Sequence, residues 1–301
     1  MAALLNTLLN VITPILLIVA LGALYGRVFQ PDPRPLSSIV IYLFSPFLVL
    51  ESLANAELST EMGRLMLLVV LLSFVMALIG LLTAGGLGLE RRLASGFTLA
   101  VVLINGGNYG IPFSEFAFGE TARPYAVVYY VISALMTNLL GVYIASRGSV
   151  SAREAVINIF KVPLMYGTII GLGLNLTNTP LPLPIARTVG LLADATIPAM
   201  LVVLGLQLSR AHIRGQLRLI STATAARLVI SPIVAVVLVA LLSLNGVAAQ
   251  VAISSSAMPT AVIASIIATQ FNSDSEFVTS VIVFSTLCSV LTLSVLVTLL
   301  T

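Results

Sequence analysis

The stretch Leu103-Ile104-Asn105-Gly106-Gly107-Asn108-Tyr109-Gly110-Ile111-Pro112 decides how this chain folds. It lies in a segment without charged residues, from Leu93 to Ser114, that is long enough to cross a bilayer. Glycine costs about 1 kcal/mol and proline about 3 kcal/mol in a helix interior. In lipid, the freed backbone groups must bond to neighbouring protein or line a wet cavity. The sequence therefore predicts a spanning helix that is broken at mid-depth, a place where carriers often bind their substrates.

The composition indicates an integral membrane protein. Hydrophobic residues make up 59% of the 301 residues and charged residues only 8%, against roughly 25% charge in soluble domains. Little sequence is left for a soluble catalytic or nucleic-acid-binding domain, so we expect neither an enzyme nor a nucleic-acid partner. A single cysteine, Cys288, and a single histidine, His212, exclude an internal disulfide and an ordinary Cys/His metal site. We expect no metal and no other cofactor.

Charged or Pro/Gly/Asn-rich breaks divide the chain into ten segments near the roughly 20 residues that a membrane span requires. The first cation, Arg27, follows the first apolar run, which is not the pattern of a cleavable signal peptide. The uncharged region from Leu228 to Ser273 is divided by a predicted turn at Asn245-Gly246. The predicted spans are residues 8–26, 36–54, 63–84, 94–118, 123–145, 156–176, 185–208, 217–243, 247–271 and 277–300.

The Lys and Arg residues predict the orientation of these spans. Ten of the cations fall on one side of the ten-span arrangement and three on the other, while Arg227 lies within a span. Because cytoplasmic loops are enriched in Lys and Arg, the side with ten is expected to be cytoplasmic. Both termini then lie on the extracytoplasmic side of the cell (inner) membrane. The ten are Arg27, Arg34, Arg91, Arg92, Arg147, Arg153, Lys161, Arg210, Arg214 and Arg218.

The two halves of the chain, residues 1–150 and 151–301, resemble one another. Ser45-Pro46 in the second span is echoed by Ile197-Pro198 in the seventh. The broken fourth span is echoed by the ninth, which is interrupted at 254–260. Because each half holds five spans, an odd number, the second half is expected to be inverted relative to the first. Paired interrupted spans in an inverted repeat point to the binding site.

The two breaks together are predicted to form one substrate site. Each half-helix N-terminus is equivalent to roughly half a positive charge, which suits an anion such as a carboxylate. Two asparagine side chains can orient that anion without a buried charge. The register stays open, because either Pro112 on Pro259 or Asn105 on Thr260 aligns the breaks. Alternatively, the small residues only permit a tight helix crossing. The predicted site residues are Asn105, Gly106, Asn108, Gly110, Pro112, Met258, Pro259 and Thr260.

Few ionisable residues lie within the predicted spans. Asp194 would cost roughly 2.5–3.5 kcal/mol at the centre of a span, so it either couples transport to a cation or lies at an interface. Glu115 follows Pro112 by three residues and is either a gating residue or a residue of the outer half of its span. Arg227 either attracts anions, pairs with Asp194 or extends toward the cytoplasm.

The motifs resemble those of a known family. Asn105-Gly-Gly-Asn-Tyr-Gly-Ile-Pro112, followed by Phe118-Gly119, resembles the fourth-helix signature of the auxin efflux carrier family of secondary transporters. Ala195-Thr-Ile-Pro198 and Ala257-Met-Pro259 extend the resemblance, in order, along nearly the whole chain. Plant members of this family have a proline at the position of Ile104.

The resemblance implies an all-α integral membrane fold of ten helices in a five-plus-five inverted repeat. Spans 1, 2, 6 and 7 would form a scaffold and a homodimer surface, and spans 3–5 and 8–10 a transport domain in which spans 4 and 9 cross. It also implies that Asn105 contacts a substrate carboxylate. We therefore expect a secondary transporter, surrounded by membrane lipids, that exports small organic anions, either auxin-like or dicarboxylate, by an elevator movement. The alternatives are a proton- or sodium-coupled carboxylate importer and an anion channel.

Overall fold

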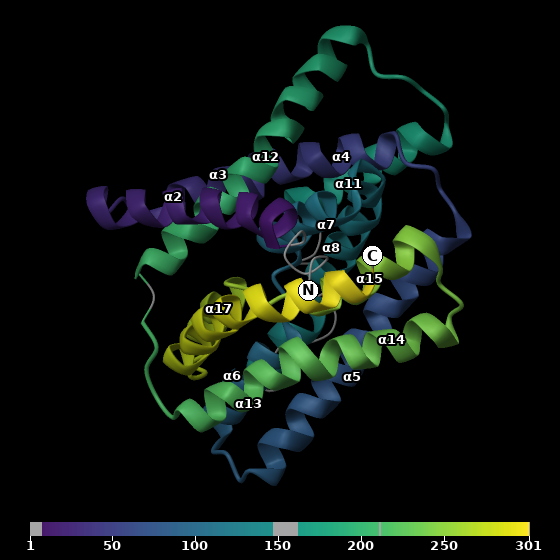
Figure 1. Ribbon diagram of the computed structural model, residues 1–301. Coiled ribbons are helices and arrows are strands. Elements are labelled where there is room, and N and C mark those ends of the chain that lie inside the picture. Colours follow the sequence, from purple (N-terminus) through teal and green to yellow (C-terminus); the bar gives the residue numbers. More distant parts are fainter. Residues whose placement is uncertain (1–7, 147–161, 211, 301) are drawn as a thin grey trace.

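The computed structural model describes residues 8–146, 162–210 and 212–300, and every regular element within these ranges is a helix (Figure 1). The predicted boundary between the halves, at residues 150 and 151, lies outside the described residues. Positions 156–161 of the sixth predicted span lie outside them as well. Inside the described ranges, the single place where two extended segments pair is an isolated antiparallel bridge between Ile104 and Thr260.

Long apolar helices confirm the predicted class, an all-α integral membrane protein. Among the described residues, six helical segments are long and apolar enough to cross a membrane, and two shorter apolar helices accompany them. The six segments are Pro33–Ala54, Thr60–Gly86, Glu120–Ser146, Leu183–Arg210, Leu217–Leu241 and Ser275–Leu300, and the shorter helices are Thr13–Phe29 and Pro163–Leu176.

Several of these segments consist of α-helices joined by single π turns, and one short 3-10 turn, η4, precedes α8. Up to Ser146, the order is η1 (Leu8–Ile12), α2 (Thr13–Phe29), α3 (Pro33–Ile39), η2 (Val40–Phe44), α4 (Ser45–Ala54), α5 (Thr60–Gly86), α6 (Arg91–Val102), η3 (Gly106–Gly110), α7 (Ile111–Phe118), η4 (Glu120–Ala122), α8 (Arg123–Met136), η5 (Thr137–Gly141) and α9 (Val142–Ser146). From Pro163 the order is α11 (Pro163–Leu176), α12 (Leu183–Arg210), α13 (Leu217–Ala225), η6 (Ala226–Ile230), α14 (Ser231–Leu241), α15 (Gly246–Ser256), α16 (Ile263–Gln270) and α17 (Ser275–Leu300).

The unbroken helices agree closely with the hydropathy pattern. The predicted spans 63–84, 185–208 and 277–300 lie inside α5, α12 and α17, which extend beyond them by at most three residues at either end. The predicted turn at Asn245-Gly246 lies where α14 gives way to α15, and Gly246 adopts a φ of 56° there. Glycine reaches that left-handed conformation without the strain that a Cβ atom would bring.

Four of the π turns immediately precede a proline. They end just before Thr13-Pro14, Ser45-Pro46, Ile111-Pro112 and Ser231-Pro232. Proline has no N–H and its ring clashes with the carbonyl four residues earlier. In a π turn the N–H bonds to the carbonyl five residues earlier, so the ladder shifts by one and the ring is accommodated. Ile111, for example, donates its N–H to the carbonyl of Gly106.

The helices form two groups, and the closest packing is found within each group. In Figure 1, α2, α4, α11 and α12 occupy the upper part of the molecule, where α2 packs along α12 and α4 packs along both α11 and α12. Backbones touch at these crossings. A Cβ atom on Gly205 would lie 2.1 Å from the carbonyl oxygen of Val19, and one on Gly167 would lie 2.3 Å from that of Pro46. Such contact requires glycine and packs membrane helices tightly.

The lower part of Figure 1 holds α5, α6, α13, α14 and α17. There α5 packs against α6 and α8, α13 and α6 pack against α17, and α14 packs against α15. The largest cluster of buried apolar side chains has most of its members in these five helices together with α8 and α15. The broken segments are held between the two groups, with α7, α8 and α15 near the middle of the view.

Candidate functional site

The predicted fourth span is interrupted at the predicted position. Helix α6 ends at Val102, and Leu103 is extended, with φ −84° and ψ 118°. The chain becomes helical again at Gly106, first as the π turn η3 and then as α7, in which Pro112 is one of the first two residues. The break is therefore a short extended connection between two half-helices.

The predicted ninth span is interrupted in the same way. Helix α15 ends at Ser256, and α16 begins at Ile263. The two connections are hydrogen-bonded to each other. The N–H of Asn105 donates to the carbonyl of Pro259 at 2.8 Å, and the N–H of Ala261 donates to the carbonyl of Leu103 at 2.9 Å. The breaks thus meet as a minimal antiparallel pair.

This pairing can be compared with the two alignments that the sequence leaves open. The bridge places Ile104 opposite Thr260. Asn105 is therefore one residue from Thr260's opposite position, whereas an alignment of Pro112 on Pro259 has no counterpart in the pairing. The pairing lies one residue from the alignment of Asn105 on Thr260 and does not reproduce either alignment, so the register of the proposed repeat stays a prediction.

The predicted site residues of the ninth span serve mainly to hold the crossing. Thr260 is fully buried, and its hydroxyl donates to the carbonyl of Ala100 in α6 at 2.7 Å. Its N–H donates to the Ser285 hydroxyl of α17 at 3.2 Å. Met258 is also fully buried, and the carbonyl of Pro259 is used in the bridge. These groups have partners within the protein, so their free binding capacity is small.

Asn105 differs from the other residues at the crossing. Its side chain is 5% exposed, and its Nδ2 atom has no hydrogen-bond partner among the described residues. Its backbone carbonyl accepts the N–H of Gly110 at 3.0 Å. A buried donor without a partner costs about 1–3 kcal/mol, so its presence in a native fold requires an explanation. Asn108 is half-buried, one turn further along.

The glycines of the break are not equivalent. A Cβ atom on Gly107 would lie 2.8 Å from the ring of Tyr130, so close packing explains that glycine. On Gly106 and Gly110, a Cβ atom would come no nearer than 3.4 and 3.5 Å to any neighbour. Packing does not require glycine at these two predicted site positions.

Arg227, in η6, donates hydrogen bonds to backbone carbonyls next to both breaks. Its side chain is 1% exposed. Nη1 donates to the carbonyls of Val101 and Val102 at 2.9 and 3.2 Å, and Nη2 donates to the Ser231 hydroxyl and the carbonyl of Ser256. The Nε atom is buried and has no partner in the described part of the chain. A single guanidinium therefore joins the C-terminal ends of α6 and α15.

This position differs from two sequence expectations. Arg227 does not extend toward the cytoplasm, because backbone carbonyls hold its guanidinium inside the protein. Nor does it pair with Asp194, and the ion pairs found among the described residues do not include it. Sequence reasoning identified the residue but not its partners, because carbonyl groups leave no signal in the side-chain sequence.

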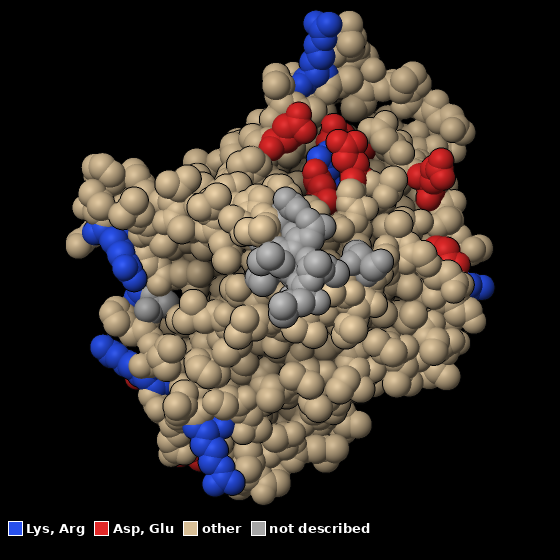
Figure 2. Space-filling model, in the orientation of Figure 1, with Lys and Arg blue, Asp and Glu red and all other residues tan. Residues whose placement is uncertain are grey.

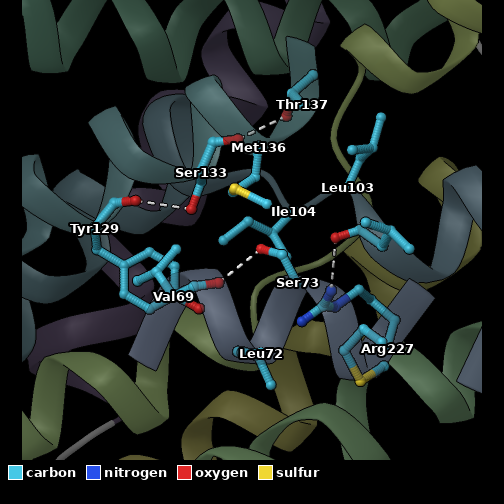
Figure 3. A pocket seen from close by; sticks show the side chains of 12 residues that line it. Val69, Leu72, Ser73, Leu103, Ile104, Tyr129, Ser133, Met136, Thr137 and Arg227 are labelled. Carbon is cyan, nitrogen blue, oxygen red and sulfur yellow. Dashed lines mark hydrogen bonds between the residues drawn. The ribbon is translucent and has the colours of Figure 1, made fainter. Parts of the chain in front are cut away.

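A small cavity adjoins Arg227. Its volume is about 20 Å³, measured as the space open to the centre of a water molecule. Hydroxyls of Ser73, Ser133 and Thr137 line it together with Tyr129 (Figure 3), and each of the three donates to a carbonyl of its own helix. A cavity of this size holds about one water molecule. It is too small for an organic anion.

The predicted coupling residues gather around a different arginine. Glu115 accepts two hydrogen bonds from Arg123, at 2.7 and 2.8 Å. Glu51 lies 3.9 Å from Arg123, and Asp194, which is exposed, lies near enough to interact with it electrostatically. We call Glu51, Glu115, Arg123 and Asp194 the acidic cluster. Acidic side chains also gather in one region of the face in Figure 2, while most visible basic side chains lie at its left and lower edges.

An apolar contact joins the crossing to the upper helices. Tyr109 and Phe113 pack edge to face, with ring centroids 6.2 Å apart. Together with Met258, they belong to a cluster of buried side chains that includes Ile15 of α2 and Leu201 of α12. Tyr109, Phe113 and Met258 thus form an apolar wall between the polar groups of the crossing and helices α2 and α12.

Comparisons with known proteins cover nearly the whole chain. The family described as Membrane transport protein matches residues 5–297. An uncharacterized transporter of Methanothermobacter thermautotrophicus is 28% identical over 96% of this chain and 95% of its own. The uncharacterized transporter MJ1031 of Methanocaldococcus jannaschii is 24% identical over 95% and 96%. A protein named putative malonate transporter, from Rhizobium meliloti, is 24% identical over 95% and 93%.

Proposed function

This chain belongs to the membrane transport protein family, and from that membership we propose that it is a secondary transporter that exports small organic anions. The family match confirms the resemblance to the auxin efflux carriers that its sequence predicts. The protein is a membrane transporter with several apolar helices. The substrate, the direction and the mechanism are the proposed part.

The buried amide of Asn105 carries the proposed substrate site. Its unpartnered Nδ2–H group can donate to a carboxylate oxygen, which would remove the cost of leaving that donor unpaired. The first N–H groups of a helix have no intrahelical acceptor, and those of η3 begin at Gly106, the next residue. Gly106 and Gly110 have no side chain to shield this backbone, although a Cβ atom at either position would come only into ordinary van der Waals contact. Asn108, which is half-buried, would orient the second end of the anion.

The substrate is proposed to be a small mono- or dicarboxylate. The name of the Rhizobium meliloti relative refers to malonate, which makes malonate a suitable first probe for this chain. The apolar wall formed by Tyr109, Phe113 and Met258 would contact a hydrophobic portion of an auxin-like acid. An auxin-like acid would therefore contact the apolar wall as well as the polar backbone, whereas a small carboxylate such as malonate would contact the polar groups alone.

We further propose ten spans in two inverted halves, residues 1–150 and 151–301. The scaffold unit comprises α2 to α4, α11 and α12, and the carrier unit comprises α5 to α9 and α13 to α17. Glycine-mediated backbone contacts support a rigid scaffold, and the largely apolar wall between the units supports a sliding, elevator-type movement. The scaffold is further proposed to form a homodimer within the membrane lipids through the exposed apolar side chains of α2 and α11.

The proposed direction follows from the membrane potential. With the cation-rich side in the cytoplasm of the cell (inner) membrane, both termini are extracytoplasmic. An inside-negative potential favours the exit of an anion by about 2.3 kcal/mol per charge per 100 mV, so export needs no coupling ion. A coupled importer would instead use the acidic cluster, with Asp194 or Glu115 as the cation-binding group.

Counterflow of radiolabelled malonate in proteoliposomes tests the substrate site. We expect saturable counterflow in the native protein and none in the folded Asn105→Ala variant. Asn138→Ala is the matched control, because the Asn138 side chain donates to the carbonyl of Ala134 in its own helix and lies away from the two breaks in the sequence. If the folded Asn105→Ala variant transports normally, the site assignment is wrong.

The same vesicles separate the alternative mechanisms. Flux that requires a sodium or proton gradient would support the coupled importer. Flux that does not saturate, without counterflow, would support the anion channel. If malonate fails, a panel of aromatic and aliphatic carboxylates, screened by thermal shift on the native protein, tests the wider substrate class.

A further inference from the structure

Arg227 is a buried cation without a carboxylate partner among the described residues. Its side chain is 1% exposed, and the ion pairs of the described chain do not include it. An arginine keeps its charge in proteins. An unpaired charge in a membrane interior is expensive, and such residues are usually functional. Something other than a counter-carboxylate must therefore compensate this charge.

Oxygen atoms from both breaks provide that compensation. The carbonyls of Val101 and Val102 belong to the end of α6, and that of Ser256 to the end of α15. Helix C-termini carry a partial negative charge, and two of them point at one guanidinium here. The Ser231 hydroxyl completes the shell and itself donates to the Ser256 carbonyl at 2.8 Å. This shell of four oxygens is of the kind that binds a cation.

In carriers with interrupted helices, half-helix C-termini and unwound carbonyls coordinate the coupling Na⁺ or H⁺. We propose that the guanidinium of Arg227 permanently occupies this cation position, so that the chain carries its counter-ion as a side chain. The two breaks then stay joined whether or not sodium is present. The part of this inference that concerns transport rests on the proposed function.

A direct role in binding the substrate fits the geometry less well. A guanidinium has five N–H donors, and four of those of Arg227 are used by protein oxygens. The remaining one, on Nε, is buried, and the cavity that Arg227 lines has room for about one water molecule. The substrate donors lie at Asn105 instead. Arg227 is therefore a positioning residue.

Guanidinium rescue tests the cation position directly. Arg227→Ala leaves the four oxygens without a cation, so its thermal unfolding midpoint should fall. Guanidinium chloride at millimolar concentration, far below the molar range that unfolds proteins, should restore the midpoint in a saturable manner. Urea and potassium chloride at equal concentrations should not. In the matched control, Arg187→Ala, an exposed arginine of α12 is removed, and guanidinium should have no effect.

Rescue should extend to function. Malonate counterflow should fall by about tenfold or more in Arg227→Ala, as expected for the loss of several charged hydrogen bonds, and should recover with guanidinium. Arg227→Lys should retain part of the activity, because an ammonium keeps the charge but cannot reach both breaks with a planar fork. Guanidinium that leaves both midpoint and flux unchanged would overturn the proposal.

Measurements on the native protein keep the test independent of any variant that fails to fold. Its unfolding midpoint and its counterflow should be the same in sodium, potassium and choline salts. A sodium requirement for native counterflow would refute the proposal that Arg227 occupies the cation position. It would leave the proposed transport function standing. Absence of counterflow with every carboxylate, combined with guanidinium rescue of the Arg227→Ala midpoint, would refute the proposed function and leave the cation position standing.

Discussion

At the scale of the residue, the crossing depends on which backbone N–H groups donate hydrogen bonds across it. The bridge takes its hydrogen bonds from the N–H groups of Asn105 and Ala261, and Ile104 contributes no N–H to it. Leu103 already has the extended conformation that precedes a proline. A proline at position 104 would therefore leave the hydrogen bonds of the pairing in place.

A pair of proline variants tests this reading. Ile104→Pro should fold, with a smaller loss of unfolding free energy than Ala261→Pro. The Ala261 variant loses a bridge hydrogen bond, worth about 1 kcal/mol, and leaves the Leu103 carbonyl unpaired. Thermal unfolding of the two purified variants gives the comparison. Equal destabilisation, or a larger loss in Ile104→Pro, would contradict the assigned pairing.

The sequence predicts the position of the break but not all the partners of its residues. Asn105, Gly106 and Pro112 mark it, because helix-breaking residues at membrane depth have no local alternative. Thr260 is a predicted site residue, whereas in the structure its hydroxyl donates to the carbonyl of Ala100. Such a bond joins residues far apart in the chain, and local patterns carry no information about it.

At the scale of the element, glycine sets how closely the scaffold helices approach. Gly205 of α12 faces the carbonyl of Val19 in α2, so the two backbones are in contact. Gly173 of α11 is also within a helix, but a Cβ atom there would meet nothing within 4 Å. The two positions therefore separate the packing role of glycine from its effect on helix propensity.

Alanine substitutions at these glycines should act in opposite directions. Gly205→Ala should lower the free energy of unfolding by about 1–3 kcal/mol, because its Cβ atom would lie 2.1 Å from the Val19 carbonyl oxygen. Gly173→Ala should raise it by about 0.5–1 kcal/mol, since alanine is the better helix former. Denaturation in detergent micelles measures both. A neutral Gly205→Ala would show that α2 and α12 can separate without loss.

The helices themselves were predicted more accurately than their internal irregularities. Long apolar runs with few charges fix α5, α12 and α17 to within a few residues because burial in lipid demands them. The π turns before Pro46 and Pro232 could have been expected from the missing N–H, but hydropathy alone does not contain them.

At the scale of the whole molecule, the acidic cluster connects the two proposed units. Glu51 and Asp194 belong to the scaffold, whereas Glu115 and Arg123 belong to the carrier unit. Glu51 and Asp194 are far in the sequence from Glu115 and Arg123, so their association could not be predicted. Asp194 was considered beside Arg227, because those two charges are rare within the spans. The structure instead places it with Arg123.

Cross-linking across the cluster tests whether the units slide. In a Cys288→Ser background, Glu51→Cys with Arg123→Cys joins positions whose side chains are 3.9 Å apart across the units. A short bis-maleimide should abolish malonate counterflow in this variant. The control pair, Glu115→Cys with Arg123→Cys, lies within the carrier unit, and its cross-linking should leave the flux at the level before cross-linking. Undiminished flux in the first cross-linked pair would contradict an elevator movement.

The bridge between Ile104 and Thr260 also restricts how the protein can diverge. In paired extended segments, a slip of one residue turns each side chain to the opposite face. An insertion within one connection would therefore turn the Asn105 side chain to the opposite face unless the other connection gained a residue as well. Homologues that gain or lose a residue at one interruption are expected to carry a compensating change in length at the other.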